Sequence, residues 1–240
     1  MVRLFDEYPV DSLIRRSLMK IRRIGVAVFV KTPGLTPLKT RLANTIGRPA
    51  AEDFYRISCK CILSTLRKWI EFSEFEVSPY WAVSEADDVA ADYWKSLPNI
   101  PQGDGDLGAK LDSVYGWLME HFDAAVLLGA DAPQVTWQIL ESGLPTSEDF
   151  VLGKAKDGGF YFFSGTKPLS KVQWQSIPYS QAQTFSRIDG LLKGEGRVRY
   201  LGELSDIDFE EDFDSLAHEL DLVQSLTSEQ KELVKWLKLR

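Results

Sequence analysis

Ala124-Ala125-Val126-Leu127-Leu128-Gly129-Ala130-Asp131-Ala132-Pro133 is the stretch that decides the fold of this chain. It opens with an unbroken apolar run, and such a run ending in turn-forming residues predicts a strand buried on both faces, as in a parallel sheet. Pro133 lacks an N–H group, so the strand must end before it. Asp131 is therefore expected at the carboxyl end of a central strand, where ligands bind in open α/β sheets.

Asp131 has two possible roles at this position. A carboxylate at the rim of the sheet can hold a divalent cation, and such a cation is a common means of binding a diphosphate. Asp also shapes turns and caps helices without any ligand. The stretch alone leaves both roles open.

The remainder of the chain alternates between strand-like and helical patterns. Further strands are expected at 24–30, 77–83, 150–153 and 198–201, and a short segment begins at Ile100. Helices are expected at 49–71, 86–95, 136–142 and 181–192, and another begins at Leu107. The aromatic segment 158–163 follows its predecessor too closely for a crossover helix, so it should run antiparallel or leave the main sheet. This order predicts one α/β domain with a mostly parallel sheet.

The composition excludes several classes of protein. Of the 240 residues 44% are hydrophobic and 26% charged, which is ordinary for a globular domain. The net charge of −7 argues against a general nucleic-acid or membrane binder. No apolar run is long enough for a membrane span, and the charged N-terminus lacks a signal core, so we expect a cytoplasmic protein.

We divide the chain into an N-terminal extension, residues 1–22, and a single domain, residues 23–240. Within the extension, a short helix is expected from Val10 to Lys20. Cys59 and Cys61 lie two residues apart in a predicted helix, where they point away from each other. They are expected to be buried thiols rather than a disulfide or a zinc site.

The loop after the first strand carries a cluster of cations. Lys39 and Arg41 stand where a helix begins, and the N–H groups of a helix N-terminus favour an anion. Arginine adds bidentate phosphate geometry. The glycine spacing of a P-loop is absent. The alternative is a solvated basic turn.

Three further motifs offer polar side chains. Gln102 precedes a glycine-rich stretch and could read the edge of a nucleobase, although the stretch could equally be a tight loop. Asp157, followed by two glycines, could face an acceptor or only form a turn. Asp206 and Asp208 would share one face of a strand, where like charges need a cation or base between them. Asp208 is the better metal candidate, and Asp212 fits a cap.

Several stretches, in this order, resemble one protein family. They are Lys31-x-Pro33 with Lys39-Thr40-Arg41-Leu42, Gly105-Asp106-Leu107-Gly108, Gly129-Ala130-Asp131-Ala132-Pro133, Gly153-x-Ala155-x-Asp157-Gly158-Gly159, Trp174 near Ser176, and Asp206-Ile207-Asp208 with Asp212. Together they resemble the glycosyltransferase-like "transferase 1" family of unknown function (DUF2064-type). That family is related to 2-phospholactate guanylyltransferase and to molybdenum-cofactor guanylyltransferases.

The resemblance implies the nucleotide-diphospho-sugar transferase fold, a GT-A type α/β/α sandwich of three layers around a mixed, mainly parallel sheet. It also implies a bound Mg²⁺ or Mn²⁺, with Asp131 and Asp208 as its ligands. The implied nucleotide-binding residues are Lys31, Pro33, Lys39, Arg41, Gln102, Gly105, Asp106 and Gly129. The implied catalytic residues are Lys39 and Arg41, as a phosphate clamp, and Asp157, facing the acceptor.

The chain departs from the family pattern at two places. Leu35-Thr36 replaces a Pro-Gly pair, which predicts a less tight phosphate loop. Lys154 replaces a proline and adds a cation near the acceptor side. The central aspartate also stands alone, without the Asp-x-Asp pair of many glycosyltransferases.

Three functions are consistent with these features. The first is metal-dependent transfer of a sugar from a nucleotide-diphospho-sugar to a small-molecule acceptor. The second is nucleotidyl transfer from a nucleoside triphosphate with release of pyrophosphate, which the lone aspartate and Lys154 favour. The third is nucleotide binding without turnover, which only the altered Leu35-Thr36 loop favours.

Overall fold

The computed structural model describes residues 21–240, and the helix expected at Val10 to Lys20 lies outside them. Seven strands form one sheet in the order β3-β2-β1-β4-β6-β5-β7. Their bounds are β1 Arg23–Val30, β2 Glu76–Val83, β3 Asn99–Pro101, β4 Ala124–Gly129, β5 Phe150–Ala155, β6 Phe160–Gly165 and β7 Val198–Leu204.

The sheet is mixed and mainly parallel. β1 pairs in parallel with both β2 and β4, and β2 pairs in parallel with β3. β6 runs antiparallel to β4 and β5, whereas β5 and β7 are parallel. Of the two alternatives expected for the aromatic segment, the antiparallel one is observed, because β6 lies between β4 and β5 and runs antiparallel to both.

Helices connect the strands and cover both faces of the sheet. They are α2 Thr40–Ile46, α3 Arg48–Phe72, α4 Asp88–Tyr93, α5 Leu107–His121, α6 Trp137–Ser142, α7 Lys171–Gln175, α8 Thr184–Glu195, α9 Asp212–Asp221 and α10 Ser228–Lys238. Polar side chains cap several of them, among them Thr136, whose hydroxyl accepts from the Ile139 N–H at the start of α6. The sequence did not predict α7, a short helix with a capping box built by Ser170 and Gln173.

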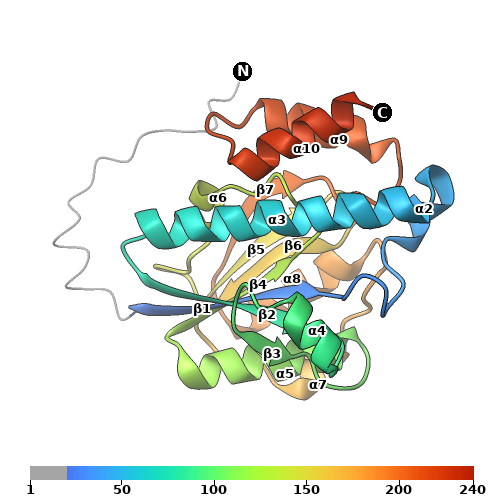
Figure 1. The fold of residues 1–240 in the computed structure, drawn as a ribbon. Coiled ribbons are helices and arrows are strands. Elements are labelled where there is room, and N and C mark those ends of the chain that lie inside the picture. Colours follow the sequence, from blue (N-terminus) through green and yellow to red (C-terminus); the bar gives the residue numbers. More distant parts are fainter. Residues whose placement is uncertain (1–20) are drawn as a thin grey trace.

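The layers follow from which faces are apolar. One core cluster joins α3, α4 and α6 to one face of the sheet, and a second joins α5, α7 and α8 to the other face. A third cluster packs α9 and α10 against the outer side of α3, so α3 is covered on both sides (Figure 1). The predicted three-layer α/β/α sandwich is confirmed, with an added outer layer of two helices.

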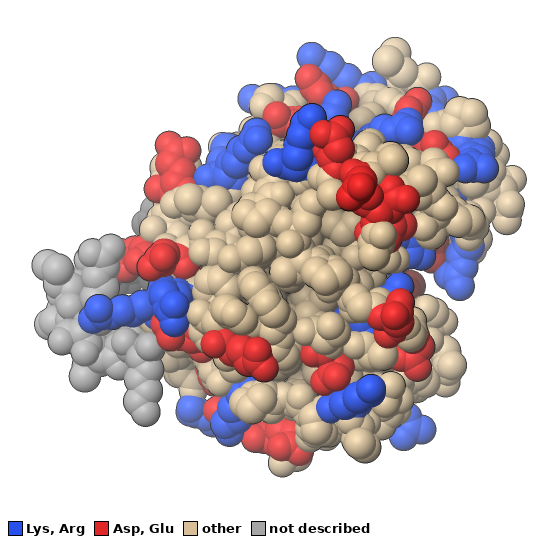
Figure 2. All heavy atoms as spheres, turned by 60° about the horizontal axis from the view of Figure 1, so that its bottom comes forward, with Lys and Arg blue, Asp and Glu red and all other residues tan. Residues whose placement is uncertain are grey.

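The surface carries both signs of charge. Figure 2 shows Lys and Arg side chains interspersed with Asp and Glu around a broad uncharged area, without a continuous basic patch on that face. Within residues 21–240, no helix combines the length and apolar character that crossing a membrane requires. Cys59 and Cys61 are both buried and free in α3, as expected.

Candidate functional site

The sheet places two loops side by side at its carboxyl end. The chain leaves β1 to one side, through α3 into β2, and β4 pairs with β1 on the other side. The loops after β1 and β4 therefore flank a topological switch point, where open α/β sheets bind ligands. The loop after β1 contributes Lys39 and the loop after β4 contributes Asp131.

Lys39 is the centre of a charged cluster in this crevice. Its Nζ lies 3.1 Å from Asp131, 3.5 Å from Asp206 and 3.8 Å from Asp208, and its side chain is only 5% exposed. The ammonium also donates to the Ile207 carbonyl at 2.9 Å. Burial lowers the pKa of Lys39, but the three carboxylates outweigh burial and raise it, so the side chain is a permanent cation.

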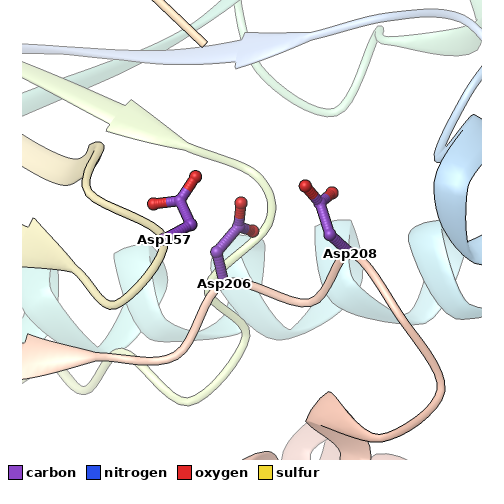
Figure 3. A group of neighbouring side chains, drawn as sticks. All are labelled: Asp157, Asp206 and Asp208. Carbon is purple, nitrogen blue, oxygen red and sulfur yellow. The ribbon is translucent and has the colours of Figure 1, made fainter. Parts of the chain in front are cut away.

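Three carboxylates converge beside this lysine. One oxygen from each of Asp157, Asp206 and Asp208 lies within 4.8 Å of the others. Figure 3 shows Asp157 on the turn between β5 and β6, with Asp206 and Asp208 on the segment after β7, all three side chains extending toward the same space. The segment is not part of a strand, yet it brings both aspartates to Lys39.

The cluster holds more negative than positive charge. Burial, and then the proximity of Asp131, Asp208 and Asp157, raise the pKa of Asp206 to about 6, although Lys39 opposes the shift. Lys39 alone therefore does not balance the carboxylates. Carboxylate oxygens grouped in this way are the donor set that Mg²⁺ and related hard cations prefer. The residues present fit a divalent cation.

The two metal ligands predicted from the sequence, Asp131 and Asp208, both contact Lys39 but do not belong to one group of carboxylates. Asp208 belongs to the group of three carboxylates. Asp131, whose side chain is 45% exposed, contacts Lys39 but is not in that group. Asp206, the third member of the group, was not among the predicted ligands. The predicted role of Asp131 as a ligand stays a prediction.

A polar cavity of about 520 Å³ opens over the cluster. It is lined by the four aspartates already described and by Lys31, Pro37, Lys39, Thr40, Arg41, Ser180, Gln181 and Ala182. Arg41 pairs with Asp208 at 2.7 Å and stays 56% exposed. Lys39 and Ser180, with φ angles of 42° and 57°, are the non-glycine residues of positive φ within residues 21–240. Strained backbone of this kind gathers at functional sites.

A second, smaller cavity adjoins the first and is mostly apolar. Its volume is about 190 Å³, and it shares Lys31, Pro37, Lys39 and Asp131 with the polar cavity. Its other lining residues are Phe29, Val30, Leu38, Tyr55, Gln102 and Leu107. Apolar walls beside a few polar groups are typical of small-molecule sites.

Gln102 is fixed in this apolar cavity. It is 4% exposed, and its Nε2 donates to the Val30 carbonyl at 3.1 Å and to the Ala82 carbonyl at 2.8 Å. Both amide hydrogens are therefore used to join the ends of β1 and β2. Its Oε1 accepts no hydrogen bond from residues 21–240 and is not among the fully buried atoms that lack a partner. Gln102 thus offers the cavity an acceptor and no side-chain donor.

The other residues named from the sequence have less direct positions. Asp106 caps α5 by accepting from the Ala109 N–H, and Gly105 has a φ of 105° in the turn before it. Gly129 is the last residue of β4. Lys154 pairs with Glu203 at 2.8 Å. None of these four lines either cavity described above, nor does Pro33.

Glu85 stabilises the loop after β1, which sequence reasoning missed. It accepts hydrogen bonds from the Thr32 N–H at 3.0 Å, from the Thr32 hydroxyl at 2.9 Å and from the Thr36 hydroxyl. Thr36 belongs to the Leu35-Thr36 pair, which stands where the family pattern has Pro-Gly. The replacement therefore supplies a hydrogen bond to Glu85 that anchors the loop. The contact spans 49 residues along the chain, and no local pattern points to it.

Comparison with known proteins supports the family resemblance. Residues 71–181 match the family model described as "Uncharacterized protein conserved in bacteria (DUF2064)". No curated protein matches the sequence significantly.

Three solved structures share the fold. A protein from Desulfovibrio desulfuricans G20, described as a proposed nucleotide-diphospho-sugar transferase, has a TM-score of 0.73 at 19% identity, covering 90% of this chain and 97% of that one. A 4-diphosphocytidyl-2C-methyl-D-erythritol synthase from Anaerococcus prevotii DSM 20548 has a TM-score of 0.52 at 11% identity, with coverages of 85% and 97%. A cytidylyltransferase from Leptospira borgpetersenii serovar Hardjo-bovis (strain JB197) has a TM-score of 0.50 at 14% identity, with coverages of 91% and 94%.

Two of these proteins are transferases by description and one is a synthase, and at such identities the likeness shows the fold alone. The motifs, the sheet order and the matching segment nevertheless agree with one another. The chain shares the fold of the nucleotide-diphospho-sugar transferase-like protein from Desulfovibrio desulfuricans G20, and its residues 71–181 match the DUF2064 family model.

Proposed function

We propose that this chain is a metal-dependent transferase that takes a sugar from a nucleotide-diphospho-sugar and passes it to a small-molecule acceptor. The observation that carries the proposal is the convergence of Asp157, Asp206 and Asp208 beside Lys39, at the switch point of a parallel sheet. Such a site combines a group of carboxylates that could bind a divalent cation with the fixed positive charge of Lys39. Both are suited to a diphosphate.

The chain's own cations are placed to bind phosphate oxygens. Lys39 is held by Asp131 and by the Ile207 carbonyl, so its ammonium stays in one position at the floor of the polar cavity. Arg41 is more exposed and can turn from Asp208 to a phosphate with its guanidinium. Fixed charges of this kind stabilise a leaving diphosphate with little reorganisation.

Asp157, Asp206 and Asp208 would hold Mg²⁺ or Mn²⁺. The cation, when bound, neutralises charge that develops on the departing nucleoside diphosphate. Asp157 Oδ1 accepts from the Gly159 N–H at 2.8 Å, which orients the carboxylate and leaves its second oxygen for a ligand. This position favours cation binding over the activation of an acceptor hydroxyl for Asp157.

The apolar cavity is suited to the base. Phe29, Leu38 and Leu107 supply apolar walls, and Gln102 Oε1 supplies a fixed acceptor. The cavity adjoins the polar one through Lys31 and Lys39, so a base in the first would place its phosphates in the second.

A binding screen with matched variants tests the proposal. We expect nucleotide-diphospho-sugars to raise the melting temperature of the wild type in the presence of Mn²⁺, by the mass action of native-state binding. The double variant Asp206→Asn/Asp208→Asn should lose that shift, while Asp92→Asn, on the exposed face of α4, should keep it. An unchanged shift in the double variant, or no shift with any nucleotide in the wild type, would refute the proposed site.

Nucleotidyl transfer is the second candidate, because two of the similar folds belong to proteins described as a cytidylyltransferase and a diphosphocytidyl-methylerythritol synthase. Lys154 gives it no support, since that side chain pairs with Glu203 and lines neither cavity. Incubation of the protein and Mn²⁺ with nucleoside triphosphates separates the candidates. Release of pyrophosphate would favour nucleotidyl transfer, whereas release of a nucleoside diphosphate from a nucleotide sugar would favour sugar transfer. Binding without either product would indicate a nucleotide-binding protein.

A further inference from the structure

Glu219, on α9 in the outer helical layer, has a carboxylate that reaches inward to several partners. Its Oε1 accepts from the Ser205 hydroxyl at 2.7 Å and from Lys156 Nζ at 2.9 Å. Its Oε2 accepts from Gln134 Nε2 at 2.9 Å, and the Ser205 N–H lies 3.2 Å from both oxygens. The Glu219 side chain is 13% exposed.

Each partner of Glu219 stands on a segment that carries one of the site's carboxylates. Lys156 directly precedes Asp157, and Ser205 directly precedes Asp206. Gln134 lies in the loop after β4, which also carries Asp131. One carboxylate therefore joins three segments that are far apart in sequence, two of which are also joined by the backbone hydrogen bond from the Lys156 N–H to the Leu204 carbonyl.

Gln134 strengthens the connection. It is 2% exposed, and its Nε2 donates to the Ser205 carbonyl at 2.8 Å as well as to Glu219. Two acceptors thus fix the orientation of the amide, and its Oε1 is left buried with no partner in residues 21–240. An unpaired buried carbonyl destabilises the folded state. Despite this unpaired carbonyl, both amide hydrogens of Gln134 are used in hydrogen bonds to the Ser205 carbonyl and the Glu219 carboxylate.

We propose that Glu219 is a positioning residue for the carboxylate cluster. Its hydrogen bonds fix the segments that carry Asp157 and Asp206 relative to the loop that carries Asp131. The inference rests on the proposed function, since it concerns the same cation site. Residues that orient metal ligands commonly change metal affinity 10- to 100-fold when they are substituted.

The test compares two glutamate-to-glutamine variants of the full chain. Glu219→Gln removes the charge of the carboxylate that joins the three segments. Glu141→Gln is the matched control, because Glu141 also accepts two hydrogen bonds, from Trp69 Nε1 at 2.5 Å and from the Ser73 hydroxyl at 2.8 Å, but on α6 and away from the carboxylates. Both variants should lower the melting temperature. Mn²⁺ affinity is measured by calorimetric titration, and amide hydrogen exchange is measured without metal.

We expect Glu219→Gln to weaken Mn²⁺ binding at least about tenfold and to speed exchange at residues 156–159 and 205–208, with neither change in Glu141→Gln. Wild-type Mn²⁺ affinity and unchanged exchange in Glu219→Gln would overturn the inference, because a purely structural role predicts only the loss of melting temperature. If the wild type binds no Mn²⁺, the proposed cation site fails, and the exchange data alone then decide whether Glu219 positions the two segments.

Discussion

The two adjoining cavities differ in how completely their polar groups are satisfied. In the apolar cavity, the Gln102 amide hydrogens are both used by strand carbonyls and one acceptor remains. In the polar cavity, four carboxylates face Lys39 and Arg41, and burial together with the neighbouring carboxylates raises the pKa of Asp206. The first region holds one acceptor in a fixed position, whereas the carboxylates of the second outnumber the two cations that they face.

This difference suggests a division of work. The apolar cavity would determine which base is bound. The polar cavity would bind the phosphates, with an affinity that depends on the cation concentration. Substitutions in the two cavities should therefore have distinct signatures, one in the choice of ligand and the other in the response to metal.

The largest stability effect is expected at Lys39. Lys39→Met would leave Asp131, Asp206 and Asp208 without their shared counter-ion, and loss of one partner from a buried ionic group costs about 3 kcal/mol. Mn²⁺ should stabilise this variant more than the wild type, because the cation replaces the missing positive charge. Denaturant unfolding with and without Mn²⁺ measures both effects.

Lys95→Met is the control for that change, because Lys95 forms an exposed pair with Asp92 on the surface. Its cost should stay below about 1 kcal/mol and should not respond to Mn²⁺. Equal costs for the two lysine variants would show that the carboxylate cluster does not depend on Lys39.

A smaller effect, on a different property, is expected at Gln102. Gln102→Met removes the two hydrogen bonds that the Gln102 amide donates to the Val30 and Ala82 carbonyls and should cost about 2 kcal/mol of stability. The wild type should prefer a nucleotide whose base donates an N–H over an analogue in which that N–H is methylated, and the variant should lose this preference. Affinities for the matched pair of nucleotides give the measurement.

Gln138→Met makes the same chemical change on the exposed side of α6 and should preserve both stability and preference. A preference that survives in Gln102→Met would place the recognition of the base elsewhere.

The smallest effect is expected at the loop anchor. Thr36→Val removes one hydrogen bond to Glu85 and should lower stability by about 1 kcal/mol. Mn²⁺ affinity should not change, because the Glu85 contacts lie on the loop and not among the carboxylates. A large loss of Mn²⁺ binding in this variant would show that the two regions are coupled.

Most of the fold could be predicted from the sequence because its signals are local. The apolar runs of β1 and β4 indicate the centre of the sheet. The short connection between β5 and β6 has no room for a crossover helix and therefore indicates an antiparallel strand. α7 escaped prediction because it has only five residues, and its evidence is a capping box rather than a periodic apolar face. The outer layer of α9 and α10 depends on contacts with α3, which no local pattern specifies.

Some residues that line the candidate site were predictable from the sequence, but their arrangement was not. Lys39, Arg41, Asp157 and Asp208 all line the polar cavity, as their motifs suggested. The sequence indicated that neighbouring aspartates need positive charge between them, but Lys39, which pairs with Asp206 and Asp208, lies 168 residues from the Ile207 carbonyl that it contacts. Glu219 was not identified because its partners converge only after folding.

The most direct test of the central claim is the location of a bound cation. Crystals of the full chain soaked in Mn²⁺ and measured at the manganese absorption edge would give an anomalous peak at each metal position. The account predicts a peak among Asp157, Asp206 and Asp208, within about 2.0–2.6 Å of their oxygens. A peak elsewhere, or none at a concentration that saturates binding in solution, would contradict it.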